Sequence, residues 1–395
     1  MVLFLLAHLI HSPIGSSADG TANQTIAARW TSDLRPAIGG EPLGLVLGRK
    51  REWQAKPRTS LWFLDDATVV ATYVTREENH PVLSGRSGSD PNEPLRLRAI
   101  FLDADTGKIR STQAWPSESR YAGIVAANEG TFVTERGTTL TLYSSDAKEL
   151  GRLSLPPRPE DGGDWHAHPS PTGNTILFST GDLMAPSAKP WIWVDGKGFR
   201  IARSWKEVQS GPMGISDSAI AMTACYYWEY HCSPVVAVRG LATEWKTIAA
   251  IEKQFQWGGV QFVNDDTLFL SGAPWELLQT DGKVILKETA PFEGGTATVS
   301  AGGKRFVVPF FKCKGGFAAL DIGAHGELST ISVYDAPFRD RSYLLLVKGH
   351  KIKSASSKSV AQLALSPDGS KLAILDGETV HLFPLPPLKR PPGQN

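Results

Sequence analysis

The sequence predicts an all-β chain that forms a single seven-bladed β-propeller over residues 41–386. A unit made of a polar turn and a short apolar strand recurs seven times. In the middle of the chain these units lie roughly 37 to 48 residues apart, the size of a blade of about four antiparallel strands. The chain is also rich in glycine (38), proline (27) and tryptophan (12), as expected for many turns and aromatic strands.

Each unit opens with a turn of Asp, Asn, Gly or Ser that leads into an apolar strand. The seven turns and their strands are 64–67 with 68–71, 128–130 with 131–133, 170–173 with 175–178, 216–218 with 219–222, 264–266 with 267–270, 301–303 with 305–308, and 366–369 with 371–375. Another apolar stretch precedes each turn. The pair of strands around the turn is therefore predicted to be an antiparallel hairpin.

A third apolar strand follows each hairpin, and several units continue into a second turn and a fourth strand. The third strands are 99–102, 140–143, 191–194, 235–238, 275–278, 331–334 and 380–383. A sheet this small cannot bury both of its faces alone. We therefore expect the sheets to pack radially, so that each covers the faces of its neighbours.

The last unit lacks a fourth strand, because a proline-rich tail (residues 387–395) follows its third strand closely. The apolar segment 43–47 belongs to no unit. We expect it to supply the missing outer strand, which would close the ring by joining the two ends of the chain.

The N-terminus has features of a targeting segment. An apolar run at residues 2–10 is too short to span a bilayer, and Ser16, Ser17 and Ala18 suit cleavage by a signal peptidase. Residues 1–18 are therefore predicted to be a signal peptide, and 19–40 a disordered segment. No Lys or Arg precedes the apolar run, so an uncleaved extension stays open. We expect a periplasmic or extracellular protein with no transmembrane segment, and a cytoplasmic protein is the alternative.

Charge and cysteine content narrow the function further. Lys and Arg number 41 and Asp and Glu 40, so there is no basic field to gather nucleic acid. Cys225 and Cys232 flank a short segment, and a disulfide between them is predicted if that segment is a hairpin loop. Two buried free thiols are the alternative. Cys313 is left as a single thiol.

The run Ser366-Pro367-Asp368-Gly369, echoed at residues 170–173, resembles the strand–turn–strand motif of WD40-like and YVTN-type propellers. The resemblance covers nearly the whole chain as a repeat pattern, and it implies a fold and a binding platform. The Gly-His and Trp-Asp signatures of true WD40 repeats are missing, which favours a divergent bacterial type. The resemblance carries no catalytic residues to this chain.

A binding face is predicted on one side of the propeller. With the strands of a blade labelled a to d from the centre outward, the long insertions fall in b–c loops, at 76–94, 181–190, 226–231 and 312–328. Loops on a rigid scaffold often carry binding residues. The candidate contact residues are Tyr226, Tyr227, Trp228, Tyr230 and His231 in one loop, Lys312 in another, and Tyr121, Trp165 and Trp257 near the channel mouth. Packing of these rings onto neighbouring loops or into the core is the alternative.

The sequence identifies no catalytic reaction and no cofactor. His166 and His168 are spaced to point to the same side of a strand, so a metal site at the channel mouth is an alternative. It would suit a propeller hydrolase, lyase or metal-dependent oxidoreductase. The leading hypothesis is a non-catalytic, exported, monomeric propeller that binds a protein, peptide or glycan partner through its b–c loops.

Overall fold

The structure is a computed structural model in which only part of the chain is described. The described residues are 26–39, 59–76, 94–119, 122–155, 165–180, 191–195, 198–202, 210–225, 232–240, 247–252, 260–271, 275–288, 293–294, 297–300, 302–313, 326–336, 338, 341–345 and 362–388. Apart from the four-residue helix α1 (Arg35–Ile38), the regular structure in these residues is strand. The all-β prediction is confirmed.

The first three sheets each contain four antiparallel strands that follow one another along the chain. The first sheet comprises β2 (Ser60–Asp65), β3 (Thr68–Arg76), β4 (Leu95–Asp103) and β5 (Ile109–Ser117). The second comprises β6 (Gly123–Asn128), β7 (Thr131–Glu135), β8 (Thr139–Ser144) and β9 (Glu149–Ser154). The third comprises β10 (Trp165–Pro169), β11 (Ile176–Thr180), β12 (Trp191–Asp195) and β13 (Gly198–Ala202).

The next three sheets repeat this order, with one extra short strand in the sixth. The fourth sheet comprises β14 (Ser210–Ile215), β15 (Ala219–Cys225), β16 (Cys232–Gly240) and β17 (Thr247–Glu252). The fifth comprises β18 (Val260–Asn264), β19 (Thr267–Leu270), β20 (Trp275–Gln279) and β21 (Val284–Glu288). The sixth comprises β22 (Glu293–Gly294) and β23 (Thr298–Val299), which both pair with β24 (Arg305–Cys313), then β25 (Gly326–Asp335) and β26 (Arg341–Leu345).

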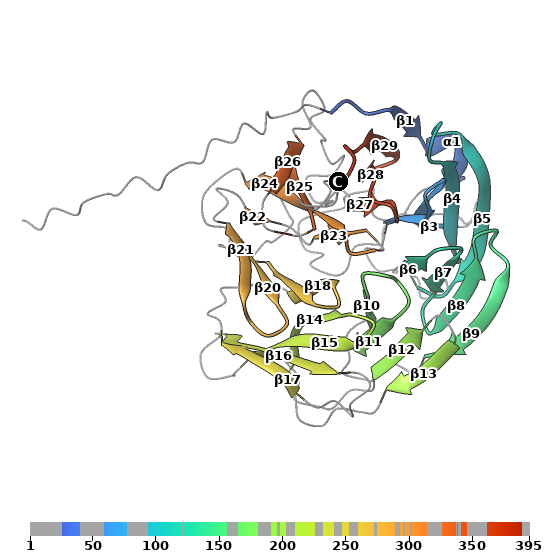
Figure 1. The fold of residues 1–395 in the computed structure, drawn as a ribbon. Helices are drawn as coiled ribbons and strands as arrows, with labels where there is room; N and C mark the ends of the chain where they lie inside the picture. The colour runs from blue at the N-terminus through green and yellow to red at the C-terminus, as the bar shows by residue number, and fades with distance from the viewer. Residues whose placement is uncertain are drawn as a thin grey trace, which may run out of the picture.

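The last sheet joins the two ends of the described chain. It comprises β27 (Gln362–Leu365), β28 (Lys371–Asp376), β29 (Thr379–Pro384) and, on its outer side, β1 (Trp30–Asp33). β1 runs antiparallel to β29, with Trp30 opposite Leu382 and Asp33 opposite Thr379. Figure 1 shows this blue strand beside the red C-terminal strands.

The outer strand of the last sheet is therefore not the one that the sequence suggested. The apolar segment 43–47 lies outside the described residues, and β1 occupies the outer position instead. Disorder was expected over residues 19–40, whereas residues 30–38 form β1 and α1. Leu34 (0% exposed) and Ile38 (1%) are buried between the last and first sheets. A four-residue strand and a four-residue helix are too short to produce a recognisable periodicity.

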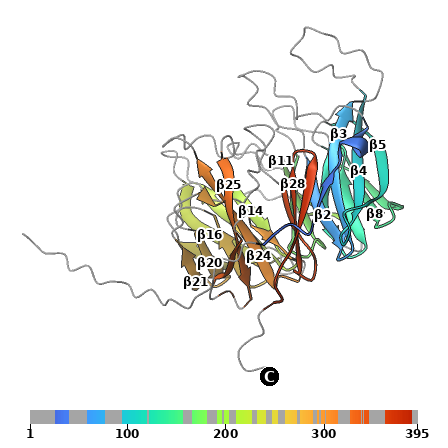
Figure 2. The same cartoon turned by 90° about the horizontal axis from the view of Figure 1, so that it is seen from above.

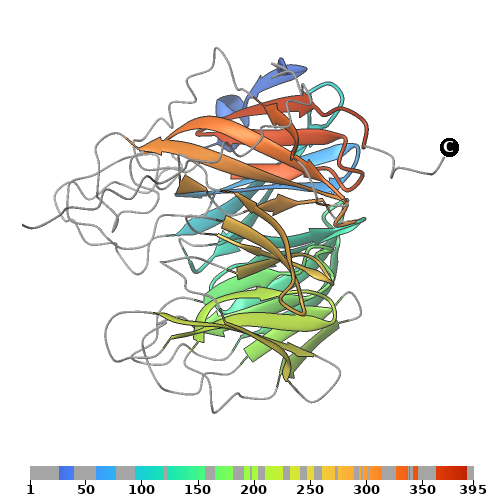
Figure 3. The same cartoon turned by 60° about the vertical axis from the view of Figure 1, so that its left-hand side comes forward.

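The sheets are arranged around a common centre, with the a strands β6, β10, β14, β18 and β27 facing inward (Figure 1). Two side views show the strands running across the thickness of a disc (Figures 2 and 3). β2 of the first sheet contacts both β6 of the second and β27 of the last. Because consecutive strands in each sheet are antiparallel, the a–b and c–d turns lie on one face of the disc and the b–c connections on the other.

Burial falls from the inside of a sheet to its outside, which explains the composition of its strands. All but the last residue of β3 (Thr-Val-Val-Ala-Thr-Tyr-Val-Thr-Arg) are buried, because neighbouring sheets cover both of its faces. Such strands are continuous runs of β-branched and apolar residues. The outer strand β5 is exposed along most of its length. Apolar clusters fill the spaces between neighbouring sheets, for example Phe269, Trp275, Phe306 and Tyr334 between the fifth and sixth.

Several a–b turns share one hairpin geometry that the sequence encodes directly. In the turn 366–369 the N–H of Gly369 donates to the carbonyl of Ser366 (2.8 Å), and Gly369 has a φ of 72°. The turn 170–173 repeats this arrangement with Gly173 at φ 74°. A Cβ at Gly173 would collide with the carbonyl oxygen of Ala127 in the neighbouring sheet. Glycine therefore permits both the left-handed backbone and the close approach of the two sheets.

Candidate functional site

On one face of the disc, the a–b turns of neighbouring sheets are joined by side-chain hydrogen bonds. Asn128 Nδ2 in the second sheet donates to Asn174 Oδ1 in the third. Thr172 Oγ1 in the third sheet donates to Asp217 Oδ2 in the fourth (2.7 Å). Bonds between turns restrict how one sheet can move against the next. These polar residues therefore stabilise the arrangement of the sheets as well as the individual turns.

A buried arginine makes the corresponding connection between the sixth and last sheets. Arg305 is 0% exposed, and its Nε lies 2.6 Å from Oδ1 of Asp335, which is 3% exposed. Its Nη1 donates to the carbonyl of Gly369 (2.5 Å) and its Nη2 to the carbonyl of Pro386 (2.9 Å). A buried charge needs a partner and satisfied donors. Arg305 thus holds the turn of the last sheet and the start of the C-terminal tail together.

The last sheet is bound to the first in a similar way. The backbone N–H of Asp368 donates to Asp66 Oδ1 (3.0 Å), and Lys371 Nζ donates to the carbonyl of Asp66 (2.6 Å). Burial raises the pKa of Asp66. Burial also acts to raise the pKa of Asp368, but hydrogen bonds from the Ser366 hydroxyl and the Ser370 N–H outweigh it and the pKa is lowered.

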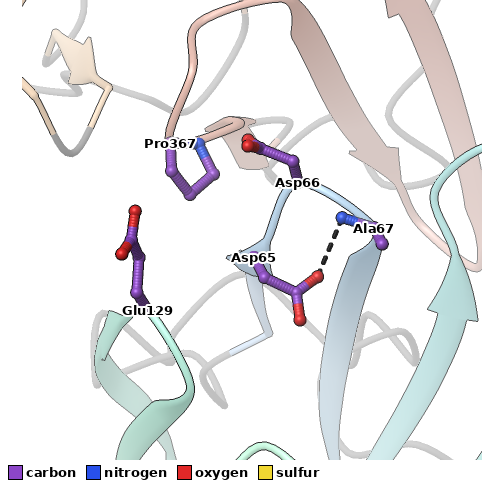
Figure 4. Close-up of a pocket in the computed structure, with 5 residues that line it drawn as sticks. All are labelled: Asp65, Asp66, Ala67, Glu129 and Pro367. Atoms are coloured by element: carbon purple, nitrogen blue, oxygen red, sulfur yellow. Dashed lines mark hydrogen bonds between the residues drawn. The ribbon is translucent and has the colours of Figure 1, made fainter.

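A cavity of about 400 Å³ lies on this same face, where turns of the first, second and last sheets meet. Figure 4 shows its lining residues, which are Asp65, Asp66, Ala67, Glu129 and Pro367. Asp65 accepts a hydrogen bond from the N–H of Ala67 (2.8 Å), and the carboxylate of Glu129 is on an exposed residue. The lining of the cavity is acidic, but the carboxylates of Asp65 and Asp66 already accept hydrogen bonds from backbone N–H groups of the turns. Sequence reasoning treated these acids only as turn residues.

The opposite face is different, as the b–c end of the last sheet shows. Asp376 ends β28, and its Oδ1 is buried without a hydrogen-bond partner. Burial raises the pKa of Asp376 to about 6. Tyr73 of the first sheet is 0% exposed, and its hydroxyl donates to the carbonyl of Gly377 (3.0 Å). Burial, reinforced by the nearby carboxylates of Glu378 and Asp33, raises the pKa of Tyr73.

The N-terminal segment packs against this end of the last sheet. The N–H of Leu34 donates to the carbonyl of Glu378 (2.8 Å). Gly39, which follows α1, lies against the guanidinium of Arg98, whose Nε donates to Thr75 Oγ1 (3.0 Å). Polar groups from three separate parts of the sequence therefore meet here. Sequence reasoning missed this cluster, because no local motif links its members.

Comparison with known proteins shows the fold but no family. No protein-family model and no curated protein sequence matches the chain. Among solved structures, a chain of a mitotic checkpoint complex is similar over 98% of this chain and 99% of its own length, with 11% identity and a TM-score of 0.51. Hsv2 of Kluyveromyces lactis is 11% identical over 80% of this chain and 90% of its own, with a TM-score of 0.47.

The fold is that of a WD40-like β-propeller. The likeness to the checkpoint-complex chain extends over nearly the full length of both chains, so it concerns the whole propeller. At 11% identity it shows the fold alone. The sheets described above are the blades of this propeller, and the propeller predicted from the sequence is confirmed at this level.

Most of the predicted binding residues lie outside the described part of the propeller. The loop between β15 and β16 is not described, and it contains Tyr226, Tyr227, Trp228, Tyr230 and His231. Tyr121 and Trp257 also lie outside the described residues. Trp165 is the first residue of β10 and Lys312 lies near the end of β24, but only their backbones are described. The proposed binding role of these side chains stays a prediction.

The backbone places the two predicted disulfide partners opposite each other. Cys225 ends β15, Cys232 begins β16, and the two residues are register partners in the antiparallel pair. The hairpin that the sequence predicted around residues 226–231 is thus present at its base. Cys313 at the end of β24 is opposite Gly326.

His166 and His168 lie together on β10, as the sequence spacing required. Their register partners on β11 are Ser179 and Leu177, and the residue of His168 is partly buried. Within the described ranges, no group of three or more His, Cys, Asp or Glu side chains is placed to hold a metal ion. None of the described helices is long and apolar enough to cross a bilayer.

Proposed function

We propose that this protein is a non-catalytic, exported interaction propeller that presents its b–c loop face to a protein, peptide or glycan partner. Its seven sheets form one closed ring of blades, sealed by β1 in the last blade. It is a divergent propeller of the bacterial YVTN-like type. Cleavage after Ala18 releases it into the periplasm or the medium.

The observation that carries this proposal is the difference between the two faces of the disc. The a–b turns are short and are hydrogen-bonded from blade to blade, as in Thr172 to Asp217 and Asp368 to Asp66. On the other face, the strands before and after several b–c connections are far apart in sequence, for example Arg76 and Leu95. The a–b face therefore supports the structure, and the long segments on the b–c face can carry residues that select a binding partner.

The aromatic b–c loop of the fourth blade is the centre of the proposed contact surface. Its base is the Cys225–Cys232 pair, where β15 and β16 meet in register. In an oxidising compartment a disulfide at this position would reduce the conformational freedom of the loop before binding. Tyr and Trp rings supply large contact areas at a low entropic cost.

A binding experiment with defined probes tests the proposal. We would screen the mature protein against an immobilised glycan panel and a displayed random-peptide library. The variant Tyr227→Ala/Trp228→Ala should weaken the selected interactions at least about tenfold, because aromatic anchors dominate such interfaces. Its thermal midpoint should stay within about 2 °C of the parent, as for substitutions outside a core.

A matched control lies on the opposite face. Glu129→Gln changes an exposed side chain at the a–b cavity and should leave binding unchanged. If that control abolishes binding and the aromatic variant does not, the binding face is the a–b face and the proposal is wrong. A large loss of stability in the aromatic variant would instead assign those rings to the core. Peptide mapping under non-reducing conditions tests the disulfide separately.

A further inference from the structure

The outer strand of the first blade has an open edge that the proposed function does not use. β5 spans nine residues, and the exposure of Ile109 to Ala114 is high without interruption. Among the described strands it pairs with β4 alone, along its inner edge. Pro116 has no N–H to donate and its carbonyl accepts from Arg136, so the available edge is the seven residues from Ile109 to Trp115, about 23 Å at roughly 3.3 Å each. The second edge therefore offers a long row of backbone donors and acceptors for a further strand.

Three other described outer strands, β9, β21 and β1, are protected by charge or by shortness. In β9 of the second blade, Glu149 and Arg152 form an ion pair on an exposed six-residue strand. β21 of the fifth blade ends in Lys287 and Glu288, and β1 has only four residues. Charged side chains, proline and short length are usual means of preventing edge-to-edge pairing. The segment from Ser111 to Trp115 has no charge and no proline, and Pro116 lies only near the end of the strand.

The one charge within β5 is neutralised by its own blade. Arg110 lies at its start, and its Nη2 is 2.5 Å from Asp103 Oδ2 while its Nη1 donates to Thr68 Oγ1 (3.1 Å). The residues that follow, Ser111 to Ala114, carry no charge and have small or uncharged polar side chains. Nothing in this stretch repels a strand of the same sequence.

We propose that β5 pairs antiparallel with β5 of a second copy of this chain, which joins two first blades into one continuous sheet across a two-fold axis. Two identical strands can always pair in this way, and the arrangement closes on itself. A net charge of +1 opposes the approach of two copies very little. The pair uses only the rim of the disc, so both faces remain accessible.

The small contact sets the expected strength. One strand edge from each copy buries less than the about 1,200 Å² typical of stable protein interfaces, so association is weak and depends on concentration. We would measure it by sedimentation velocity between about 1 and 500 μM, where a dissociation constant in the micromolar to millimolar range is visible. The parent should shift from monomer to dimer across this range.

Charge substitutions test whether β5 is the contact. Thr112→Lys places two like charges close together at the axis and should raise the dissociation constant about tenfold or more. Leu150→Lys on β9 is the matched control, because Leu150 is 53% exposed on the outer strand of the neighbouring blade; it should change nothing. An equimolar mixture of Thr112→Lys and Thr112→Glu should recover the dimer.

A cysteine scan tests the symmetry. Antiparallel pairing across a two-fold axis brings one residue of the strand next to its own copy. One of Ser111→Cys, Thr112→Cys, Gln113→Cys and Ala114→Cys should therefore give a disulfide-linked dimer under mild oxidation, above the background of the parent. A parent that remains monomeric at 500 μM would overturn the proposal. So would a dimer that Leu150→Lys weakens as much as Thr112→Lys, or cross-links that form only within one chain or only with other proteins.

Discussion

The last blade carries an aspartate at each of its two ends, and the two carboxyl groups are in opposite environments. In the a–b turn, Asp368 accepts hydrogen bonds from the Ser366 hydroxyl (2.6 Å) and the Ser370 N–H (2.8 Å), and its pKa is lowered. At the b–c end, Asp376 has a buried Oδ1 without a hydrogen-bond partner, and burial raises its pKa to about 6.

This difference indicates which face of the propeller serves the fold. At the a–b end, Arg305, Lys371 and Asp66 bind the turn to both neighbouring blades, so the polar groups there stabilise the native arrangement. At the b–c end, a carboxyl group is retained at a cost in stability. Groups with perturbed pKa values that do not support the fold are often found at functional sites. The comparison agrees with the b–c face proposed above as the binding face, and substitutions at the two ends test it.

The largest effect is expected from removing the central connection of the a–b face. Arg305→Met leaves the carboxylate of Asp335 buried without its cation and two carbonyl groups without their donor. We expect a loss of about 3–5 kcal/mol in the free energy of unfolding, as for other broken buried ion pairs. Urea denaturation followed by tryptophan fluorescence measures it.

A double variant separates the ion pair from the packing around it. Arg305→Met with Asp335→Leu removes both charges, and it should recover much of the stability lost in the single variant. If Arg305→Met alone unfolds with the parent's midpoint, the a–b face is not the structural side of the propeller and the comparison fails.

A smaller effect is expected at the outer side of the same blade. Trp30 of β1 donates its Nε1 proton to the carbonyl of Ala104 in the first blade (3.0 Å), and its ring lies against Gly107. Because the ring is only partly buried, Trp30→Ala should cost about 2 kcal/mol. Trp30→Phe keeps most of the packing and should lose only the hydrogen bond, about 1 kcal/mol. Thermal unfolding followed by circular dichroism would rank the two variants; equal losses would contradict this assignment.

The repeat pattern was sufficient to predict the fold, because each blade is encoded locally. Turns such as Ser366-Pro367-Asp368-Gly369 are followed at once by a buried strand, and the structure has a hairpin at each of these places. The outer strand of the last blade was not predictable in this way. β1 pairs with a strand about 350 residues away, and its four residues Trp-Thr-Ser-Asp are not apolar enough to stand out.

The polar clusters were harder to predict than the strands, since they depend on distances between blades. Asp376 and Tyr73 are 303 residues apart in the sequence, yet the Tyr73 hydroxyl donates to Gly377, the residue after Asp376. No spacing rule connects such positions. The predicted aromatic loop at Tyr227 lies outside the described residues, so its role rests on the binding experiment.

The smallest effect, and the most direct test of the comparison, is a pair of substitutions with opposite signs. The pKa of Asp376 is about 6 in the folded protein, above the value of about 3.9 for an unfolded chain, so the native state loses stability as the pH rises from about 4 to 6. Asp376→Asn should therefore unfold like the parent near pH 4 and be more stable above pH 6.5. Because the group is only half buried, screening by solvent reduces the gain to about 1 kcal/mol.

Asp368→Asn should have the opposite effect. The pKa of Asp368 is lowered in the folded protein, so this carboxyl group contributes stability above the unfolded pKa, and the contribution is lost as the pH falls. Unfolding midpoints of both variants from about pH 2.5 to 8 would show the two trends, with the effect of Asp376→Asn appearing above pH 4 and that of Asp368→Asn disappearing below it. If both variants are destabilised at pH 7, the two ends of the blade are equivalent and the b–c face is not distinguished by its carboxyl group.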